Sequence, residues 1–243
     1  MRDPDLLLLL RLGFVPGMTR GEYWRHMLRL LFSPRFQAQM TLTRLHANLV
    51  EARGVRLAAA WIWLLALLAL AASGWWLELL LAYLLPVFVF GNMAALLQLL
   101  SEHTYVHLGQ GRDSRRLIWS RLTHARFFGE ALPAPGASLW RFIGFWLRMF
   151  FWHLPLRIWV VPGDLSNHDW HHVEPGDARW TQAAYARRDA ARTAAETGVP
   201  YLEVWGLTNA LDLTFRHLAA VPKGADLGEP ESYGWIDPDL LSM

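Results

Sequence analysis

The chain has 243 residues, of which 53% are hydrophobic and 18% charged, and its formal net charge is +2. Soluble domains contain about a quarter charged residues, so this composition favours a membrane protein. The sequence contains no cysteine, which excludes disulfides, thiolate-bound zinc, iron–sulfur clusters and cysteine nucleophiles. Any metal must therefore be bound by histidine, aspartate or glutamate.

Positive charge is concentrated near the start of the chain. Residues 1–56 are rich in arginine, and we expect them to form helices on the cytoplasmic side of a membrane or at its interface. No arginine-rich face coincides with the signature of a nucleic-acid-binding fold, so we expect no nucleic-acid partner.

Two apolar runs follow, at residues 57–73 and 77–100. At about 1.5 Å per residue, the first nearly crosses a hydrocarbon core of about 30 Å and the second is long enough to cross back. The Gly-Trp-Trp link permits only a tight turn, so the two runs predict one transmembrane helical hairpin. Arginines flank both ends of the hairpin and are absent from its turn, which places both flanks in the cytoplasm. We expect an integral protein of a bacterial-type inner membrane.

A third apolar stretch, at residues 139–161, contains Arg141, Arg148 and Pro155. Two arginines facing lipid in mid-membrane would be costly, so this stretch predicts an interfacial or re-entrant helix. Residues 177–198 and 199–221 predict further helices. The expected fold is therefore an all-α integral membrane protein, with the hairpin, the interfacial element and a cytoplasmic helical cap in one domain. That domain covers residues 57–221, and a polar acidic tail covers residues 222–243.

The histidines fall in two clusters. His103 and His107 are spaced i, i+4 where the second apolar run ends, and "HDWHH" contains His168, His171 and His172. On a helix, both spacings place imidazoles on one face, as a metal site requires. The alternative for the first pair is two interfacial histidines without a ligand role. For the second cluster a packing role is harder to defend, since neutral rings need partners and protonated rings repel.

The isolated histidines are less decisive. His124 is as compatible with an exposed surface position as with a metal ligand, and His153 fits packing at the interface nearly as well as ligation. Glu102 is either a partner that fixes the tautomer of a ligand ring or an interfacial charge. We expect Glu102 and Asp169 to contact ligand histidines rather than the metal.

The chain resembles the membrane-bound fatty acid desaturase and hydroxylase superfamily, whose members bind two irons through histidine boxes. "HTYVH" is similar to the first box of that family, "HDWHHVEP" to its last box, and "TGVPYLEV" to the segment that follows the last box. The resemblance implies an O2-dependent, di-iron oxidoreductase of lipid metabolism that desaturates or hydroxylates an acyl or alkyl chain, with electrons from an external donor. The middle box of the family is missing.

The resemblance implies iron ligands at the histidines of both boxes, with those between the boxes in place of the missing one: His103, His107, His124, His153, His168, His171 and His172. Asn167, His217, Glu130 and Asp177 are further candidates to complete the shell, and so, as the alternative to contacting ligand histidines, are Glu102 and Asp169. No catalytic group beyond the metal ligands is assigned.

An arginine-rich segment follows the first box: Arg112, Arg115, Arg116 and Arg121. These residues are candidates for docking an acidic partner, such as a ferredoxin, a cytochrome, an acyl or peptidyl carrier protein, or an anionic lipid headgroup. The alternative is a loop whose charge only sets membrane topology.

Two other classes remain open from the residues alone. One is a non-catalytic membrane protein that binds a metal or haem. The other is an assembly factor that retains a degenerate desaturase-like fold.

Overall fold

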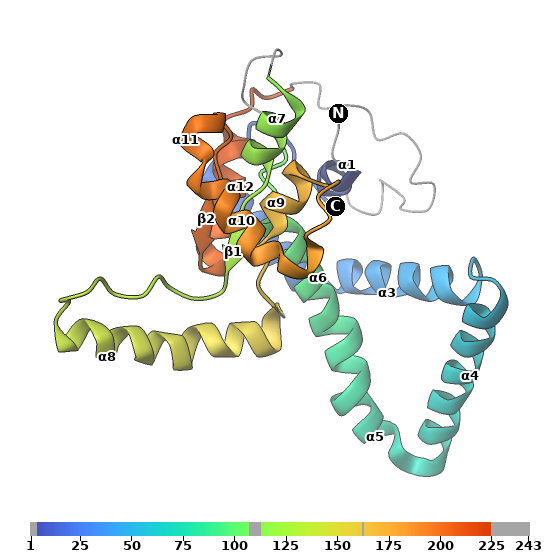
Figure 1. The fold of residues 1–243 in the computed structure, drawn as a ribbon. Helices are drawn as coiled ribbons and strands as arrows, with labels where there is room; N and C mark the ends of the chain where they lie inside the picture. The colour runs from blue at the N-terminus through green and yellow to red at the C-terminus, as the bar shows by residue number, and fades with distance from the viewer. Residues whose placement is uncertain (1–3, 107–112, 162, 225–243) are drawn as a thin grey trace.

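The computed structural model describes residues 4–106, 113–161 and 163–224 (Figure 1). It is mostly helical, at 70% of residues, as predicted for an all-α protein. The α-helices are α1 (Pro4–Arg11), α2 (Arg20–Leu31), α3 (Pro34–Leu49), α4 (Gly54–Leu70), α5 (Trp76–Leu79), α6 (Gly91–Glu102), α7 (Arg115–Leu122), α8 (Leu139–Arg148), α9 (His168–Val173), α10 (Ala183–Arg192), α11 (Ala194–Thr197) and α12 (Leu207–Ala219). The π-helical and 3-10 segments are η1 (Ala71–Trp75), η2 (Leu80–Phe90), η3 (Met149–His153), η4 (Leu156–Val160) and η5 (Trp180–Gln182). The strands are β1 (Ala125–Phe127) and β2 (Glu203–Trp205).

The helical run from Gly54 to Glu102 includes α4, η1, α5, η2 and α6. Within the described residues it is the one helix long and apolar enough to cross a membrane, judged by length and composition alone. Gly74 has a φ of 96°, which favours glycine, and the chain reverses direction there (Figure 1). The indole nitrogen of Trp63 donates a 2.8 Å hydrogen bond to the Tyr83 hydroxyl across the two arms.

The N-terminal helices belong to the main hydrophobic core. Side chains of α1, α2, α6 and α12 pack together in it, and the buried Phe215 ring stacks on Tyr23 with centroids 5.5 Å apart. The boundary proposed at residue 56 lies inside the first turn of α4. The tail proposed at residues 222–243 lies outside the described residues from residue 225 onward.

A short parallel sheet, absent from the sequence-based prediction, connects the segments that carry the histidines. β1 pairs with β2 in the register Ala125↔Glu203 and Phe127↔Trp205. Beside β1, Thr123 forms a bridge to His103 and Arg126 forms one to Leu165. The start of the helix predicted at residues 199–221 is therefore wrong: Glu203–Trp205 form a strand, because their backbone pairs with a distant part of the chain, and α12 begins at Leu207.

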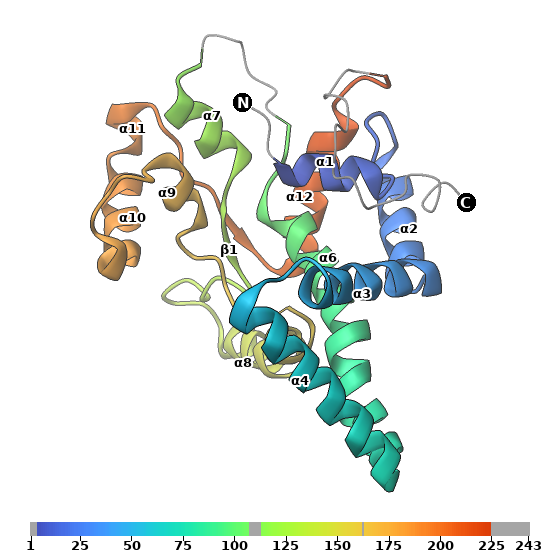
Figure 2. The same cartoon turned by 90° about the vertical axis from the view of Figure 1, so that its right-hand side faces the viewer.

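The stretch at residues 139–161 forms α8, η3 and η4, which lie across the direction of the α4–α6 arms (Figures 1 and 2). Phe145 is buried, whereas Trp140, Phe151 and Trp159 are each 78% exposed. Arg148 forms two hydrogen bonds to Glu130, of 2.5 and 2.8 Å, and so fixes α8 to the preceding loop. The element thus presents an aromatic surface away from the core.

Candidate metal centre

The first histidine of the site follows directly after a helix. α6 ends at Glu102, and His103 has extended backbone angles, φ −130° and ψ 159°. Tyr105 has a φ of 63°, so the chain has left the helix. The expectation that His103 and His107 share one helical face is therefore wrong, because backbone pairing with Thr123 replaces helical pairing at this point. His107 lies outside the described residues.

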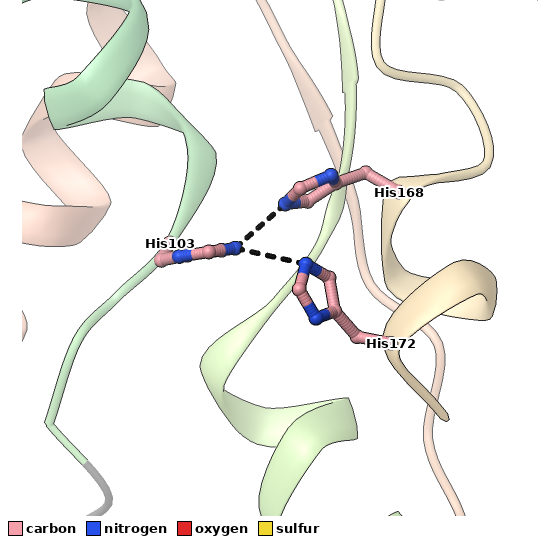
Figure 3. Close-up of side chains that lie close together, drawn as sticks. All are labelled: His103, His168 and His172. Carbon is pink, nitrogen blue, oxygen red and sulfur yellow. Dashed lines mark hydrogen bonds between the residues drawn. The ribbon is translucent and has the colours of Figure 1, made fainter. Parts of the chain in front are cut away.

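The second part of the site is the short helix α9. Its residues His168 and His172 are spaced i, i+4, which places both rings on one face, and both point toward His103 (Figure 3). The Nε2 atom of His103 lies 2.7 Å from Nε2 of His168 and 3.2 Å from Nε2 of His172. The three candidate ligand atoms all lie within 4.8 Å of one another.

The three rings occupy a poorly hydrated position. His103 is 5% exposed, and His168 and His172 are half-buried. Burial, together with the neighbouring rings of His103 and His172, lowers the pKa of His168 from 6.5 to about 2. His168 is therefore neutral at physiological pH, the form of imidazole that binds metals.

The contacts around these rings fix their positions. The Trp119 ring stacks on His172 with centroids 4.7 Å apart and an interplanar angle of 17°. The Thr214 hydroxyl donates a 2.8 Å hydrogen bond to the backbone carbonyl of His103. Trp119 comes from α7 and Thr214 from α12, and both lie outside the two boxes. Sequence reasoning missed both, and no local pattern marks them.

Asp169 binds an arginine. It is fully buried, and its two carboxylate oxygens accept hydrogen bonds of 2.8 and 2.9 Å from Arg187 of α10. Arg187 also reaches Glu203 of β2 at 3.0 Å. Through Arg187, Asp169 thus connects α9 to α10 and to the sheet. In the sequence, Asp169 lies between His168 and His171.

The remaining proposed histidine ligands do not belong to the converging set, although the His171 ring packs edge-on against His172 with centroids 5.1 Å apart. His171 is exposed, and its ring packs edge-on against Trp180 at 4.8 Å. Nε2 of the buried His124 lies 3.1 Å from the Ser101 carbonyl, and burial lowers its pKa to about 4. His153 lies 3.4 Å from Glu130. His217 hydrogen-bonds to the backbone of Val106, outside the converging set.

The proposed carboxylate and amide ligands also make other contacts. Glu102 accepts a hydrogen bond from Gln98 on its own helix, and Asp177 pairs with Arg179 at 2.6 Å. Asn167 occupies the N-cap position of α9 without a side-chain capping bond. The converging set in the described residues therefore consists of His103, His168 and His172.

The proposed docking arginines differ in their surroundings. Arg115 is exposed at the start of α7, whereas Arg116 forms an ion pair with Glu174 and Arg121 one with Asp113 at 2.8 Å. Arg112 lies outside the described residues. Arg126, from the same arginine-rich part of the sequence, is fully buried.

The comparisons with known proteins found no relative. No protein-family model matches the chain, no curated protein matches it, and no solved structure matches it. The geometry of the three histidines is therefore the structural basis for proposing a function.

Proposed function

We propose that this protein is a membrane-anchored, iron-dependent oxidoreductase that desaturates or hydroxylates an acyl or alkyl chain, as its resemblance to the desaturase and hydroxylase superfamily implies. The observation that carries the proposal is the convergence of His103, His168 and His172 Nε2 atoms from two segments 65 or more residues apart in sequence. We further propose that the site binds two irons.

The three converging imidazole nitrogens are better suited to binding a cation than to hydrogen-bonding with one another. In a neutral imidazole one ring nitrogen donates and the other accepts. Nε2 of His103 faces two other Nε2 atoms, and one ring nitrogen cannot form a good hydrogen bond to both. A cation at the meeting point satisfies all three lone pairs at once. Imidazole nitrogens suit iron as well as zinc and copper.

Bound iron would supply O2 activation and the removal of hydrogen from an unactivated C–H bond. The chain itself supplies orientation. The bridge to Thr123 and the Thr214 hydroxyl hold the backbone of His103. Trp119 covers one face of His172 and excludes water from it.

The placement of the site supports a membrane-derived substrate. His103 directly follows α6, the last part of the apolar run Gly54–Glu102. We propose that this run is a transmembrane hairpin, that α8 and η4 lie at the bilayer surface, and that the histidines face the cytoplasm. An acyl chain in the bilayer then reaches the metal from the α6 side.

We propose that the electron donor, a ferredoxin or cytochrome, docks at α7. Arg115 is the arginine there that points to solvent without an ion pair among the described residues. An acidic carrier protein would use the same charge complementarity.

A second candidate, a non-catalytic metal-binding protein, is favoured by one observation. Three histidines converge in the described residues, whereas a di-iron centre of this superfamily uses more ligands. Both functions include a bound metal, so metal content alone does not separate them. Conversion of a substrate must be measured as well.

The test combines both measurements. Detergent-purified protein from iron-supplemented cells is analysed for metal by mass spectrometry, and then incubated with acyl substrates, O2, NADPH, ferredoxin and its reductase. We expect iron in the wild type and a new double bond or hydroxyl group in the substrate. His172→Ala should lose both, and His46→Ala, at an exposed position on α3, should keep both. Iron without product favours the non-catalytic function, zinc contradicts the iron assignment, and a haem absorption band identifies a haem protein.

A further inference from the structure

A groove lies at the corner where α3 meets the two arms of the apolar hairpin, apart from the histidine site. It has a volume of about 430 Å³ and is lined by residues of α3, α4 and η2, among them Arg44, Asn48, Arg56, Ala60, Trp63 and Phe88. In Figure 1, α3 and the two arms form a triangle, and the lining residues come from all three of its sides.

The α3 side of this triangle is firmly attached to the hairpin. The side-chain amide of Asn92 on α6, which is fully buried, donates to the backbone and side-chain oxygens of Gln37 at 3.3 and 3.1 Å and to Thr41 at 3.2 Å. Buried amides of this kind are costly unless they are paired, so the three acceptors hold α3 across the second arm. The groove is therefore preformed.

The groove has one charged end and one apolar end. Arg56, Ala59, Ala60 and Trp63 follow the spacing i, i+3, i+4, i+7, which places them along one face of α4. At about 1.5 Å per residue, Trp63 lies about 10 Å further along the helix than Arg56. Phe88 lines the groove from η2. The charge therefore lies at the level of α3, and the apolar walls extend down the hairpin.

The guanidinium groups of Arg44 and Arg56, at the charged end of the groove, have no acidic partner within the described residues. The carboxylate ion pairs found there involve other arginines. Arg56 instead donates to the side-chain oxygen of Asn48 at 3.2 and 3.0 Å, and Asn48 donates to the backbone carbonyl of Arg44 at 2.7 Å. The bonds to Asn48 orient the Arg56 guanidinium, and neither arginine's positive charge is compensated by a carboxylate of the described residues.

We propose that this groove is a binding site for an anionic phospholipid, with the phosphate headgroup between Arg44 and Arg56 and an acyl chain along Ala60, Trp63 and Phe88. Guanidinium groups suit phosphate because they donate in a planar fork. Basic pockets between membrane helices on the cytoplasmic side bind anionic headgroups. The proposal rests on the membrane placement given above and is independent of the metal.

The test is native mass spectrometry of the full chain in detergent, titrated with phosphatidylglycerol or with phosphatidylcholine of identical acyl chains. We expect the wild type to retain one phosphatidylglycerol with about tenfold or greater preference over phosphatidylcholine, which two basic contacts supply. Arg44→Gln/Arg56→Gln should abolish the preference. Ala60→Trp, which fills the apolar part, should weaken phosphatidylglycerol binding with both charges intact.

The matched control is Arg35→Gln/Arg53→Gln, which removes the same net charge from two exposed arginines outside the groove lining. It should bind phosphatidylglycerol like the wild type. Equal binding of the two lipids by the wild type overturns the proposal, as does an equal loss in both double variants. Displacement of the lipid by inorganic phosphate at equal concentration also overturns it. Iron content, measured on the same samples, reports separately on the metal centre.

Discussion

Arg187 and Asp169 form a buried, two-pronged ion pair, with Arg187 Nε 2.8 Å from one carboxylate oxygen and Nη2 2.9 Å from the other. Asp169 is the residue directly after His168, so this ion pair sets the position of α9 against α10. The orientation of two of the three converging rings thus depends on an arginine that lies outside both boxes.

Arg187→Met is expected to lower the free energy of unfolding by about 3–5 kcal/mol, because it leaves the Asp169 carboxylate buried without a counter-charge. Iron affinity should fall by about 10- to 100-fold, as is typical when a residue that supports metal ligands is lost. Unfolding in detergent and metal content measure the two effects. Arg188→Gln is the control, because Arg188 is a neighbouring arginine whose pair with Asp189 is exposed. Equal behaviour of the two variants would contradict the assignment.

The two adjacent histidines of α9 should respond differently to substitution. His172→Ala removes a ring whose Nε2 faces His103 at 3.2 Å, and iron content should fall at least about tenfold, since a ligand is lost. His171→Ala removes an exposed ring that packs on Trp180, and iron content should stay within about twofold of the wild type. Metal analysis of the two variants side by side checks this. A loss in His171→Ala as large as in His172→Ala would place His171 among the ligands.

The stability of the protein should fall as the pH decreases below 6.5, in part through His124. Burial lowers its pKa from 6.5 to about 4, so the unfolded chain binds a proton at a pH where the folded chain does not. The contribution of neutral His124 is therefore complete above pH 6.5 and is lost as the pH falls toward 4. Its share of the loss between pH 6.5 and pH 5 is about 2 kcal/mol.

His124→Gln measures that share. Its unfolding free energy should vary less steeply between pH 7 and pH 5 than that of the wild type, by about 2 kcal/mol over the interval. His46→Gln, which removes an exposed imidazole on α3, serves as the control for the loss of one histidine. Parallel curves for His124→Gln and the wild type would show that folding does not lower the pKa of His124.

The proposed topology can be tested directly because the chain has no cysteine. Ser73→Cys introduces a thiol at the exposed hairpin turn, and Glu196→Cys introduces one on the exposed surface of α11. In intact cells, a membrane-impermeant maleimide should label Ser73→Cys and not Glu196→Cys, because the positive-inside rule places the turn outside and the histidine cap inside. Both should react after cell lysis. The reverse pattern in intact cells would invert the orientation.

Much of the local structure could be predicted from the pattern of apolar residues and from glycines at turns and helix ends. The apolar runs at residues 57–73 and 77–100 predicted the two arms, and Gly74 takes the positive φ that the short link demands. Residues 177–198, predicted as one helix, form η5, α10 and α11 with a break at Thr193, and Gly198, with a φ of 67°, ends α11. These features depend on neighbouring residues, whose side-chain spacing and backbone preferences are visible in the sequence.

The sequence by itself determined which histidines were available and that they lie in two clusters on either side of the arginine-rich segment. Only the tertiary structure decided which of them meet. Pairing of residues 123–127 with His103, Leu165 and β2 brings the two boxes together and accompanies the end of α6 at Glu102, before the first histidine of the box. The pair between Asp169 and Arg187 then sets the rotation of α9, so that His168 and His172 point inward and His171 points outward. Backbone pairing and buried ion pairs join residues far apart in sequence, and no local pattern encodes them.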